Sequence, residues 1–402
     1  MCYTIPESKQ TAAERRRIVK EQEYMSLFSL DNRVAPMGLL VMDGARELGR
    51  EIDAYLVQWA RQIGMDVDTF MIESECPRFS SGDGKGLIKS TVRGMDLYII
   101  VDVGNYSIKY KYFGQQNAMS PDDHFQDLKR LIQAASGKAH RINIVMPLLY
   151  GGRQHRRSYR ESLDCAFMLQ ELQNMGVENV VTFDAHDPRV QNAVPLMGFD
   201  NLMPHYQVLK RMFRDFPDIV TDPEHFMLVS PDEGALNRNM YYASVLGVNL
   251  GMFYKRRDYS RVVNGRNPII AHEYLGESVE GKDVFTADDI ISSGESMLDI
   301  AYNLKARKAK RFFAYATYAI FTNGLDKFDK AYQDGIIDGV FGSNLTYTMP
   351  ELLEREWYHQ VDVSKYVAYY ISALNHDISV TNLIDPHDKI EALLAKRAGA
   401  AK

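Results

Sequence analysis

Short apolar runs alternate with segments of helical periodicity from Met37 to the end of the chain. The runs are rich in β-branched and aromatic residues at consecutive positions, which is typical of strands buried on both faces. These expected strands fall at 97–103, 142–147, 180–184, 226–230, 248–254, 284–287 and 312–320. Apolar residues recur at three- and four-residue spacing in the expected helices at 45–63, 124–135, 161–175, 233–243, 296–304 and 365–374. The alternation predicts an α/β fold with two doubly wound domains and mainly parallel sheets.

The domain organisation follows from length and from the positions of these units. A chain of 402 residues has room for two or three domains. We expect an N-terminal α/β domain at 37–203 and a C-terminal α/β domain at 204–380. Residues 1–36 are charged and lack strand signals, so we interpret them as an appended arm with one short helix at 12–24. A last helix within 381–402 is expected to pack back on the N-terminal domain.

Charge, hydropathy and cysteine content exclude several classes of protein. The formal net charge of −6 provides no domain-wide basic field for a nucleic-acid backbone, so no nucleic-acid partner is expected. No apolar stretch approaches the roughly 20 residues of a membrane helix, and the most apolar run, 311–321, is interpreted as a buried strand. Three widely spaced cysteines make neither a disulfide framework nor a zinc knuckle. A cytoplasmic setting fits these features best.

The segment 284–296 carries the strongest chemical signal. An apolar strand ends in Asp288 and Asp289, and a loop with Ser292, Ser293, Gly294 and Ser296 leads into a helix. Paired carboxylates can accept hydrogen bonds from neighbouring sugar hydroxyls, while amides and hydroxyls at a helix N-terminus favour a phosphate. The segment therefore suits a sugar phosphate, although an N-capping loop beside two surface acids would have the same composition.

Three further polar groups follow expected strands. Lys255 to Arg257 open the polar stretch 258–267, which we interpret as a lid whose cations neutralise phosphate charge, although a solvated basic edge is the alternative. His186 and Asp232 follow different strands and could hold Mg²⁺, which needs few protein ligands beside waters and phosphates, whereas a core histidine is the alternative. Arg153 and Gln154 follow the strand at 142–147 and could bind adenine or its phosphates.

A collinear series of these motifs resembles one family. The segment 284–296 resembles the PRPP-binding signature of the type I phosphoribosyltransferase fold. The segments 146–154, 182–186, 229–234, 254–257 and 313–317 resemble, in the same order, motifs of the ribose-phosphate pyrophosphokinases (PRPP synthetases). The resemblance covers roughly 38–385 and implies that both domains are phosphoribosyltransferase-like.

The resemblance also implies a reaction and a set of roles. In this family the C1 hydroxyl of ribose 5-phosphate attacks the β-phosphorus of MgATP, giving PRPP and AMP. By that match, the catalytic residues are Lys255 and Arg257, the ATP-binding residues are Phe79, Asp83, Arg153 and Gln154, the ribose 5-phosphate-binding residues are Asp288, Asp289, Ser292, Ser293, Gly294 and Ser296, and the metal ligands are His186 and Asp232. A homo-oligomer is implied as well, built on dimers and extending to hexamers, in which Phe79 and Asp83 reach a neighbouring subunit's ATP.

The chain departs from the family pattern inside these motifs. Ser292 stands where an acid is usual, Glu295 where a glycine is usual, His155 where an acid is usual and Tyr318 where a histidine is usual. Two other functions therefore stay open, a PRPP-consuming phosphoribosyltransferase and a non-catalytic regulatory relative of PRPP synthetase. We expect Glu295 to point outward from the first turn of its helix, where a carboxylate complements the helix dipole.

Overall fold

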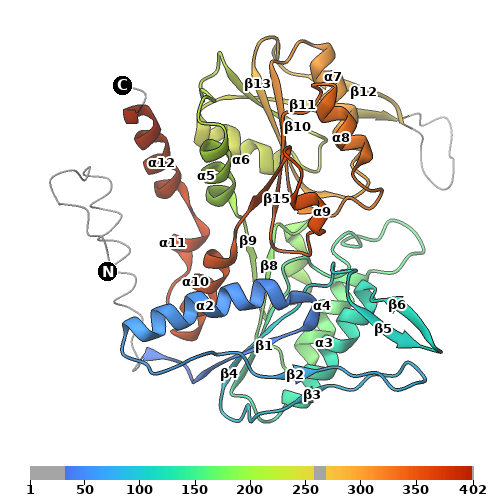
Figure 1. Ribbon diagram of the computed structural model, residues 1–402, viewed down its shortest axis with the longest axis vertical. Coiled ribbons are helices and arrows are strands. Elements are labelled where there is room, and N and C mark those ends of the chain that lie inside the picture. Colours follow the sequence, from blue (N-terminus) through green and yellow to red (C-terminus); the bar gives the residue numbers. More distant parts are fainter. Residues whose placement is uncertain (1–31, 258–268, 401–402) are drawn as a thin grey trace.

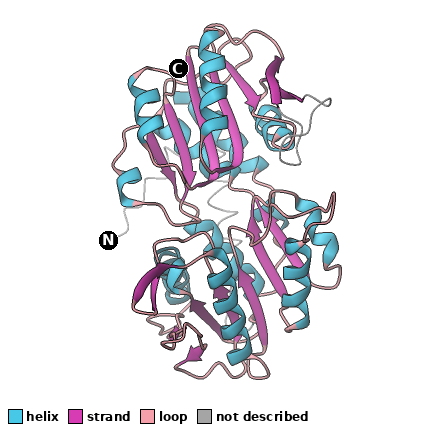
Figure 2. Ribbon diagram, turned by 90° about the vertical axis from the view of Figure 1, so that its right-hand side faces the viewer, coloured by secondary structure: helices cyan, strands magenta, loops and turns pink. Residues whose placement is uncertain are grey.

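The structure is a computed structural model in which residues 32–257 and 269–400 are described. Figure 1 shows two sheets, one in each half of the molecule, with helices packed on both faces of each. Figure 2 shows the two halves from the side, joined at the middle of the long axis. The α/β class with mainly parallel sheets is thus confirmed.

The first sheet contains five parallel strands. In spatial order they are β1 (Met37–Val41), β4 (Asp96–Ile100), β7 (Arg141–Val145), β8 (Asn179–Phe183) and β9 (Gly198–Leu202). A single parallel bridge from Leu39 to Met71 extends the sheet beyond β1. The chain therefore runs outward from β1 to Met71 and then returns to β4 on the other side, so the winding direction reverses beside β1.

Helices cover both faces of the first sheet. On one face, α2 (Arg46–Gln62) packs its buried Leu48, Ile52 and Leu56 against the strands. On the other face lie α3 (Pro121–Ala135) and α4 (Asp164–Asn174). Two antiparallel hairpins extend from this half, β2 (Ser74–Glu75) with β3 (Leu87–Ile88) and β5 (Lys109–Tyr112) with β6 (Gln115–Ala118).

The second sheet contains seven strands and is parallel except for one edge strand. In spatial order they are β12 (Ile269–Leu275), β11 (Asn249–Arg257), β10 (Phe226–Ser230), β13 (Asp283–Ile291), β14 (Arg311–Ala319), β15 (Gly339–Ser343) and β16 (Tyr358–Val361). Only β12 is antiparallel to its neighbour. The chain winds outward from β10 to β12 and then returns to β13, so the winding direction reverses between β10 and β13. In open α/β sheets, ligands bind at the carboxyl ends of the strands beside such a reversal.

The faces of the second sheet are covered in the same way. The buried residues of α5 (His205–Asp215) and α6 (Leu236–Leu246) join one apolar cluster, and those of α7 (Glu295–Ala306) and α8 (Asp326–Gln333) join another. The short helix α9 (Pro350–Leu353) precedes β16. The α5 and α6 cluster continues into the α2 face of the first sheet, so the two halves share one apolar core.

The last helix of the chain packs in a different place from the one expected from the sequence. The last helix, α12 (His387–Ala400), follows the short α11 (Thr381–Ile384) and contacts α5 and α6 of the second half, not the N-terminal half as expected. Arg397 on α12 donates to the carbonyl oxygens of Phe213 and Ile219.

The helix that crosses back is α10 (Ser364–Asn375), which lies along α2. Its end is anchored to the first sheet, because Asn375 Nδ2 donates to the buried Asp96 at 2.9 Å and Arg141 donates to the Leu374 carbonyl at 2.8 Å. The sequence predicts both C-terminal helices, but its local pattern does not indicate which half of the molecule each one covers.

All seven expected strands and six expected helices are present, with ends shifted by a few residues. The apolar run 311–321 forms the buried strand β14, and no helix among the described residues is long and apolar enough to cross a membrane. The expected helix at 12–24 lies outside the described residues. The boundary near 203 stays a prediction.

Candidate active site between the two sheets

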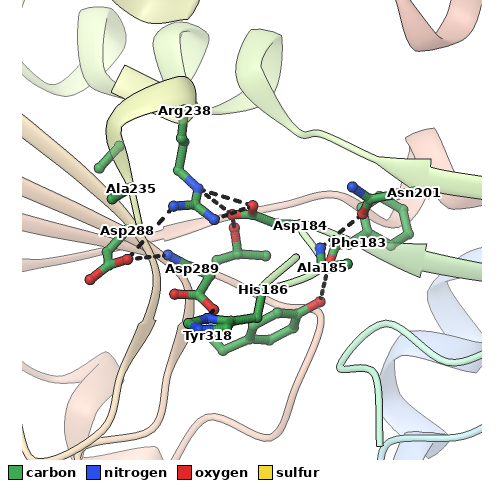
Figure 3. Close-up of polar contacts among 12 residues, drawn as sticks. Phe183, Asp184, Ala185, His186, Asn201, Ala235, Arg238, Asp288, Asp289 and Tyr318 are labelled. Carbon is green, nitrogen blue, oxygen red and sulfur yellow. Dashed lines mark hydrogen bonds and ion pairs between the residues drawn. The ribbon is translucent and has the colours of Figure 1, made fainter. Parts of the chain in front are cut away.

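The carboxyl ends of strands from both sheets meet between the two halves. Thr317 and Tyr318, near the end of β14, form hydrogen bonds with residues that follow or end β7 and β8 of the first sheet. Asp288 and Asp289 lie on β13, next to β14. The polar residues predicted from two distant parts of the sequence therefore face one another (Figure 3).

A buried arginine lies at the centre of this region. Arg238 on α6 donates from Nε to both carboxylate oxygens of Asp184 at 2.9 Å, and from a terminal nitrogen at 2.6 Å. Thr317 Oγ1 donates to the same carboxylate at 2.6 Å. A terminal nitrogen of Arg238 also lies 3.6 Å from Asp288. Since the side chains of Arg238 and Asp184 are 9% and 2% exposed, this ion pair links the two halves out of contact with water.

Asp184 adopts a backbone conformation that is uncommon for a residue with a side chain. Its φ is +44°, in the left-handed region, directly after β8. Asp is among the residues that tolerate this region, and such conformations cluster at functional sites because the surroundings must hold them. Here the bonds from Arg238 and Thr317 hold the side chain, and the turn exposes His186 two residues later.

His186 closes the contact between the sheets. Its Nδ1 lies 2.8 Å from an oxygen of Asp289, and the Asp289 amide donates to Asp288 Oδ1 at 2.9 Å. The predicted metal ligand His186 and the predicted ribose-binding carboxylates of Asp288 and Asp289 are thus brought together. Hydrogen bonding to Asp289 raises the pKa of His186 against the opposing effect of burial, and the positive charge of nearby Arg153 also opposes the rise.

The surroundings of Asp288 and Asp289 shift the pKa values of the two carboxyl groups in opposite directions. Burial and the neighbouring Asp289 raise the pKa of Asp288 well above its usual range, although Arg238 opposes this. Burial would also raise the pKa of Asp289, but the His186 hydrogen bond and the Arg238 charge outweigh it and lower the pKa to about 2. The pair therefore presents one ionised carboxylate and one that holds a proton more readily, an arrangement that can both accept and donate hydrogen bonds to hydroxyls.

The serine-glycine loop follows the acids and begins α7. Gly294 has φ +78° and a Cβ there would lie 2.3 Å from the Phe328 ring, so glycine is required on both counts. Ser293 is half-buried, whereas Ser296 is exposed in the first turn of α7. Amides at a helix N-terminus, together with nearby hydroxyls such as these, can bind an anion.

Glu295 lies on the outside of this loop, as expected. Its Oε1 accepts a hydrogen bond from Lys327 Nζ at 2.7 Å, and its side chain is 57% exposed. The carboxylate is directed to a surface cation on α8. Glycine is not required at this position for the loop to keep its shape.

The predicted nucleotide residues fall into two separate places. Arg153 and Gln154 are exposed in the loop after β7, and Arg153 lies near enough to His186 to affect its pKa. Phe79 and Asp83 are exposed at the tip of the β2–β3 hairpin, where the Phe79 amide donates to the Asp83 carbonyl at 2.7 Å. No contact among the described residues joins this tip to His186, so within one chain the hairpin stands apart from the acids.

The predicted catalytic cations lie only partly within the described structure. The backbone of Lys255 and Arg257 forms the end of β11, where this strand pairs with β12 and extends beyond its last residue paired with β10, Met252. Their side chains, and the expected lid at 258–267, lie outside the described residues. Their assignment stays a prediction.

The predicted metal site contains few protein ligands. Asp232 follows β10, accepts from the Ala235 amide at 3.2 Å and contributes to the raised pKa of Asp288. In the described parts of the chain, no group of three or more His, Cys, Asp or Glu side chains is close enough to hold a metal ion by itself. Because Mg²⁺ is usually held by one or two carboxylates, waters and substrate phosphates, the Asp232 carboxylate fits that ion, whereas His186 would add a nitrogen donor.

Arg238 and Asp102 are two buried charged residues that were not selected from the sequence. Arg238 follows Ala235 by three residues on the buried face of α6, and a cation at such a position requires a buried partner, so the helical spacing carried a signal. Asp102, after β4, accepts from the Thr346 hydroxyl at 2.9 Å and the Tyr347 amide at 2.7 Å in the second half. Nothing local in the sequence indicates that distant partner.

The fold and this site define a class. Two doubly wound sheets, with an acid pair and a serine-glycine loop beside the reversal of the second sheet, are those of a phosphoribosyltransferase-type α/β protein. The model of the phosphoribosyl transferase domain matches residues 210–334, and that of the N-terminal domain of ribose phosphate pyrophosphokinase matches residues 37–176.

Proteins that are similar to this chain in sequence or in structure support both family matches. Ribose-phosphate pyrophosphokinase of Vibrio cholerae is 29% identical over 315 residues, covering 77% of this chain and 90% of that protein. The enzyme of the same name from Vibrio parahaemolyticus is 31% identical over 272 residues, covering 66% and 77%. The crystal structure of phosphoribosylpyrophosphate synthetase from Mycobacterium smegmatis has the same fold, with a TM-score of 0.68 at 18% identity over 85% of this chain and 99% of that chain. The chain belongs to the ribose-phosphate pyrophosphokinase family, as the sequence motifs indicated.

Proposed function

We propose that this protein is a ribose-phosphate diphosphokinase, which transfers the pyrophosphoryl group of MgATP to the C1 hydroxyl of ribose 5-phosphate and releases PRPP and AMP. One observation carries the proposal: the 2.8 Å contact between His186 and Asp289. It brings His186, which follows β8 of the first sheet, next to Asp289 on β13 of the second sheet. Transfer between two bound substrates requires such an approach.

The sugar phosphate binds on the second sheet. Asp288 and Asp289 hold the ribose hydroxyls, and the loop of Ser292, Ser293, Gly294 and Ser296 encloses the 5-phosphate. The outward position of Glu295 and its bond to Lys327 support this role, because they keep a negative charge away from the loop. The same position argues against a purely regulatory protein with a blocked phosphate site.

The nucleotide binds on the first sheet. Arg153 and Gln154 contact ATP beside His186, while Phe79 and Asp83 on the hairpin serve the ATP of a neighbouring subunit in a homo-oligomer. His186 would offer its Nε2 to Mg²⁺, since its Nδ1 faces Asp289, and Asp232 would offer a carboxylate. When bound, the ion neutralises phosphate charge and orients the polyphosphate. Lys255 and Arg257 stabilise the charge that develops on the transferring group.

One assay tests the proposal. Purified protein is incubated with ribose 5-phosphate, ATP and Mg²⁺, and AMP and PRPP are quantified over time. Equal amounts of AMP and PRPP, both dependent on ribose 5-phosphate and abolished by chelation, are expected. AMP release without ribose 5-phosphate would identify an ATP hydrolase instead. PRPP consumption in the presence of a nucleobase would favour a phosphoribosyltransferase. The homo-oligomeric state and the cytoplasmic setting stay predictions.

A further inference from the structure

Tyr318 is the departure from the family pattern that the structure places deepest in the molecule. It lies on β14, where the family commonly has histidine, and its side chain is 2% exposed. In the register of the sheet it pairs with Ile290, the residue after Asp289. The ring therefore originates on the strand next to the sugar acids, in the second half of the molecule.

The hydroxyl of Tyr318 forms hydrogen bonds with the first half of the molecule. It donates to the carbonyl oxygen of Phe183 at 2.7 Å (Figure 3). It also donates to the carbonyl oxygen of Pro147 at a shorter distance. Phe183 is the last residue of β8, immediately before Asp184, and Pro147 opens the loop that carries Arg153 and Gln154. Because a phenol has a single proton, one hydrogen is shared between the two carbonyl oxygens. Complete burial raises the pKa of Tyr318 well above its usual range, so the hydroxyl keeps that proton.

Neighbouring bonds hold the tyrosine end of β14 in place. Thr317 donates through its hydroxyl to Asp184, and its own carbonyl accepts from Ser343 on β15. The Pro147 carbonyl is also bound by Thr182 Oγ1 at 2.8 Å and the Phe183 amide at 3.1 Å. The Tyr318 hydroxyl thus joins an already ordered strand end to the starts of two loops at once.

We propose that Tyr318 is a positioning residue. It holds the loop after β7, which carries Arg153 and Gln154, and the loop after β8, which carries His186, at a fixed distance from the carboxylates of Asp288 and Asp289. This inference rests on the proposed function. Each substrate keeps its own proposed contacts when the Tyr318 hydroxyl is removed, so the hydroxyl is not needed for binding either substrate alone. Its effect is on the relative placement of the two substrates, to which group transfer is sensitive on the scale of 1 Å.

The test is Tyr318→Phe, which keeps the ring and removes only the hydroxyl. The matched control is Tyr98→Phe. Tyr98 is also fully buried and lies in the middle of β4. It donates one hydrogen bond, to Asp96 at the start of that strand at 2.7 Å, away from the strand ends that form the site. Both variants lose one buried hydrogen bond, so both should melt at similar, slightly lower temperatures.

For Tyr318→Phe we expect kcat to fall about tenfold while the KM values for ATP and ribose 5-phosphate change by less than about twofold. Tyr98→Phe should retain the kcat of the parent protein. Equal kcat values in the two variants would overturn the inference, because the hydroxyl would then only stabilise the fold. Inactivity of the parent and control proteins would instead refute the proposed function.

A second readout does not depend on activity. Amide hydrogen exchange is measured by mass spectrometry in peptides covering 147–155 and 183–187. The amides of Gly152, Gln154 and Ala185 are hydrogen-bonded there and report on both loops. We expect exchange in both peptides to accelerate about threefold or more in Tyr318→Phe and to stay unchanged in Tyr98→Phe. Unchanged exchange in Tyr318→Phe would refute the positioning role even if the protein had no PRPP synthetase activity.

Discussion

Replacing Arg238 with methionine should strongly destabilise the protein. Methionine retains much of the length and apolar stem of the side chain but removes the cation that bonds Asp184. Both side chains are nearly inaccessible to water, with 9% and 2% exposure. Removing one partner of a buried ion pair leaves the other charge uncompensated, at a cost of about 3–5 kcal/mol. We therefore expect the free energy of unfolding to fall by about 4 kcal/mol in Arg238→Met.

Equilibrium unfolding in urea, without substrates, measures this change. The control is Arg61→Met, which removes a surface ion pair with Asp68 whose side chains are 56% and 97% exposed, and should cost less than about 1 kcal/mol. Adding Asp184→Asn to Arg238→Met should recover at least about 1 kcal/mol, because the stranded carboxylate is removed. An Arg238→Met protein as stable as Arg61→Met would refute the reasoning, as would a double variant less stable than Arg238→Met.

Four other expectations concern the site and its surroundings. Lys255→Ala should lower kcat about a hundredfold with little change in ATP affinity by calorimetry, and a near-normal rate of AMP formation would contradict the assignment. Asp288→Asn should weaken ribose 5-phosphate binding and spare ATP binding, so a variant that loses only ATP affinity would reverse the roles of the two sheets. Glu295→Gly should change ribose 5-phosphate affinity by less than about twofold, because the carboxylate is bonded to Lys327 outside the loop, and a several-fold gain would show that it reaches the phosphate. Burial raises the pKa of Asp102 to about 6, so the folded protein binds a proton that the unfolded chain releases near pH 4, and stability from this group is lost as pH rises from 4 to 6. The unfolding free energy of the parent relative to Asp102→Asn should fall by up to about 3 kcal/mol between pH 4 and pH 7, and a constant difference would exclude the shift.

The sequence determined the elements and most of the candidate site. Hydrophobic periodicity depends on which face of a local segment is buried, so it located the strands and helices without knowledge of their neighbours. The position of polar residues after apolar strands indicated Asp288, Asp289 and His186, because parallel strands place their carboxyl ends at one edge. Outward placement of Glu295 followed from the favourable charge of a first helical turn.

Only the tertiary structure decided which elements meet. Helices were predicted from the sequence at both α10 and α12, yet α10 covers the first half through Asn375 and Asp96, while α12 packs on the second. Arg238 and Tyr318 appeared in the sequence as a helix residue and a family departure. Their partners, Asp184 and the Pro147 carbonyl, lie 54 and 171 positions away. Such pairings depend on the packing of whole sheets. A buried charge or hydroxyl requires a hydrogen-bonding partner, but the local sequence does not specify which distant residue provides it.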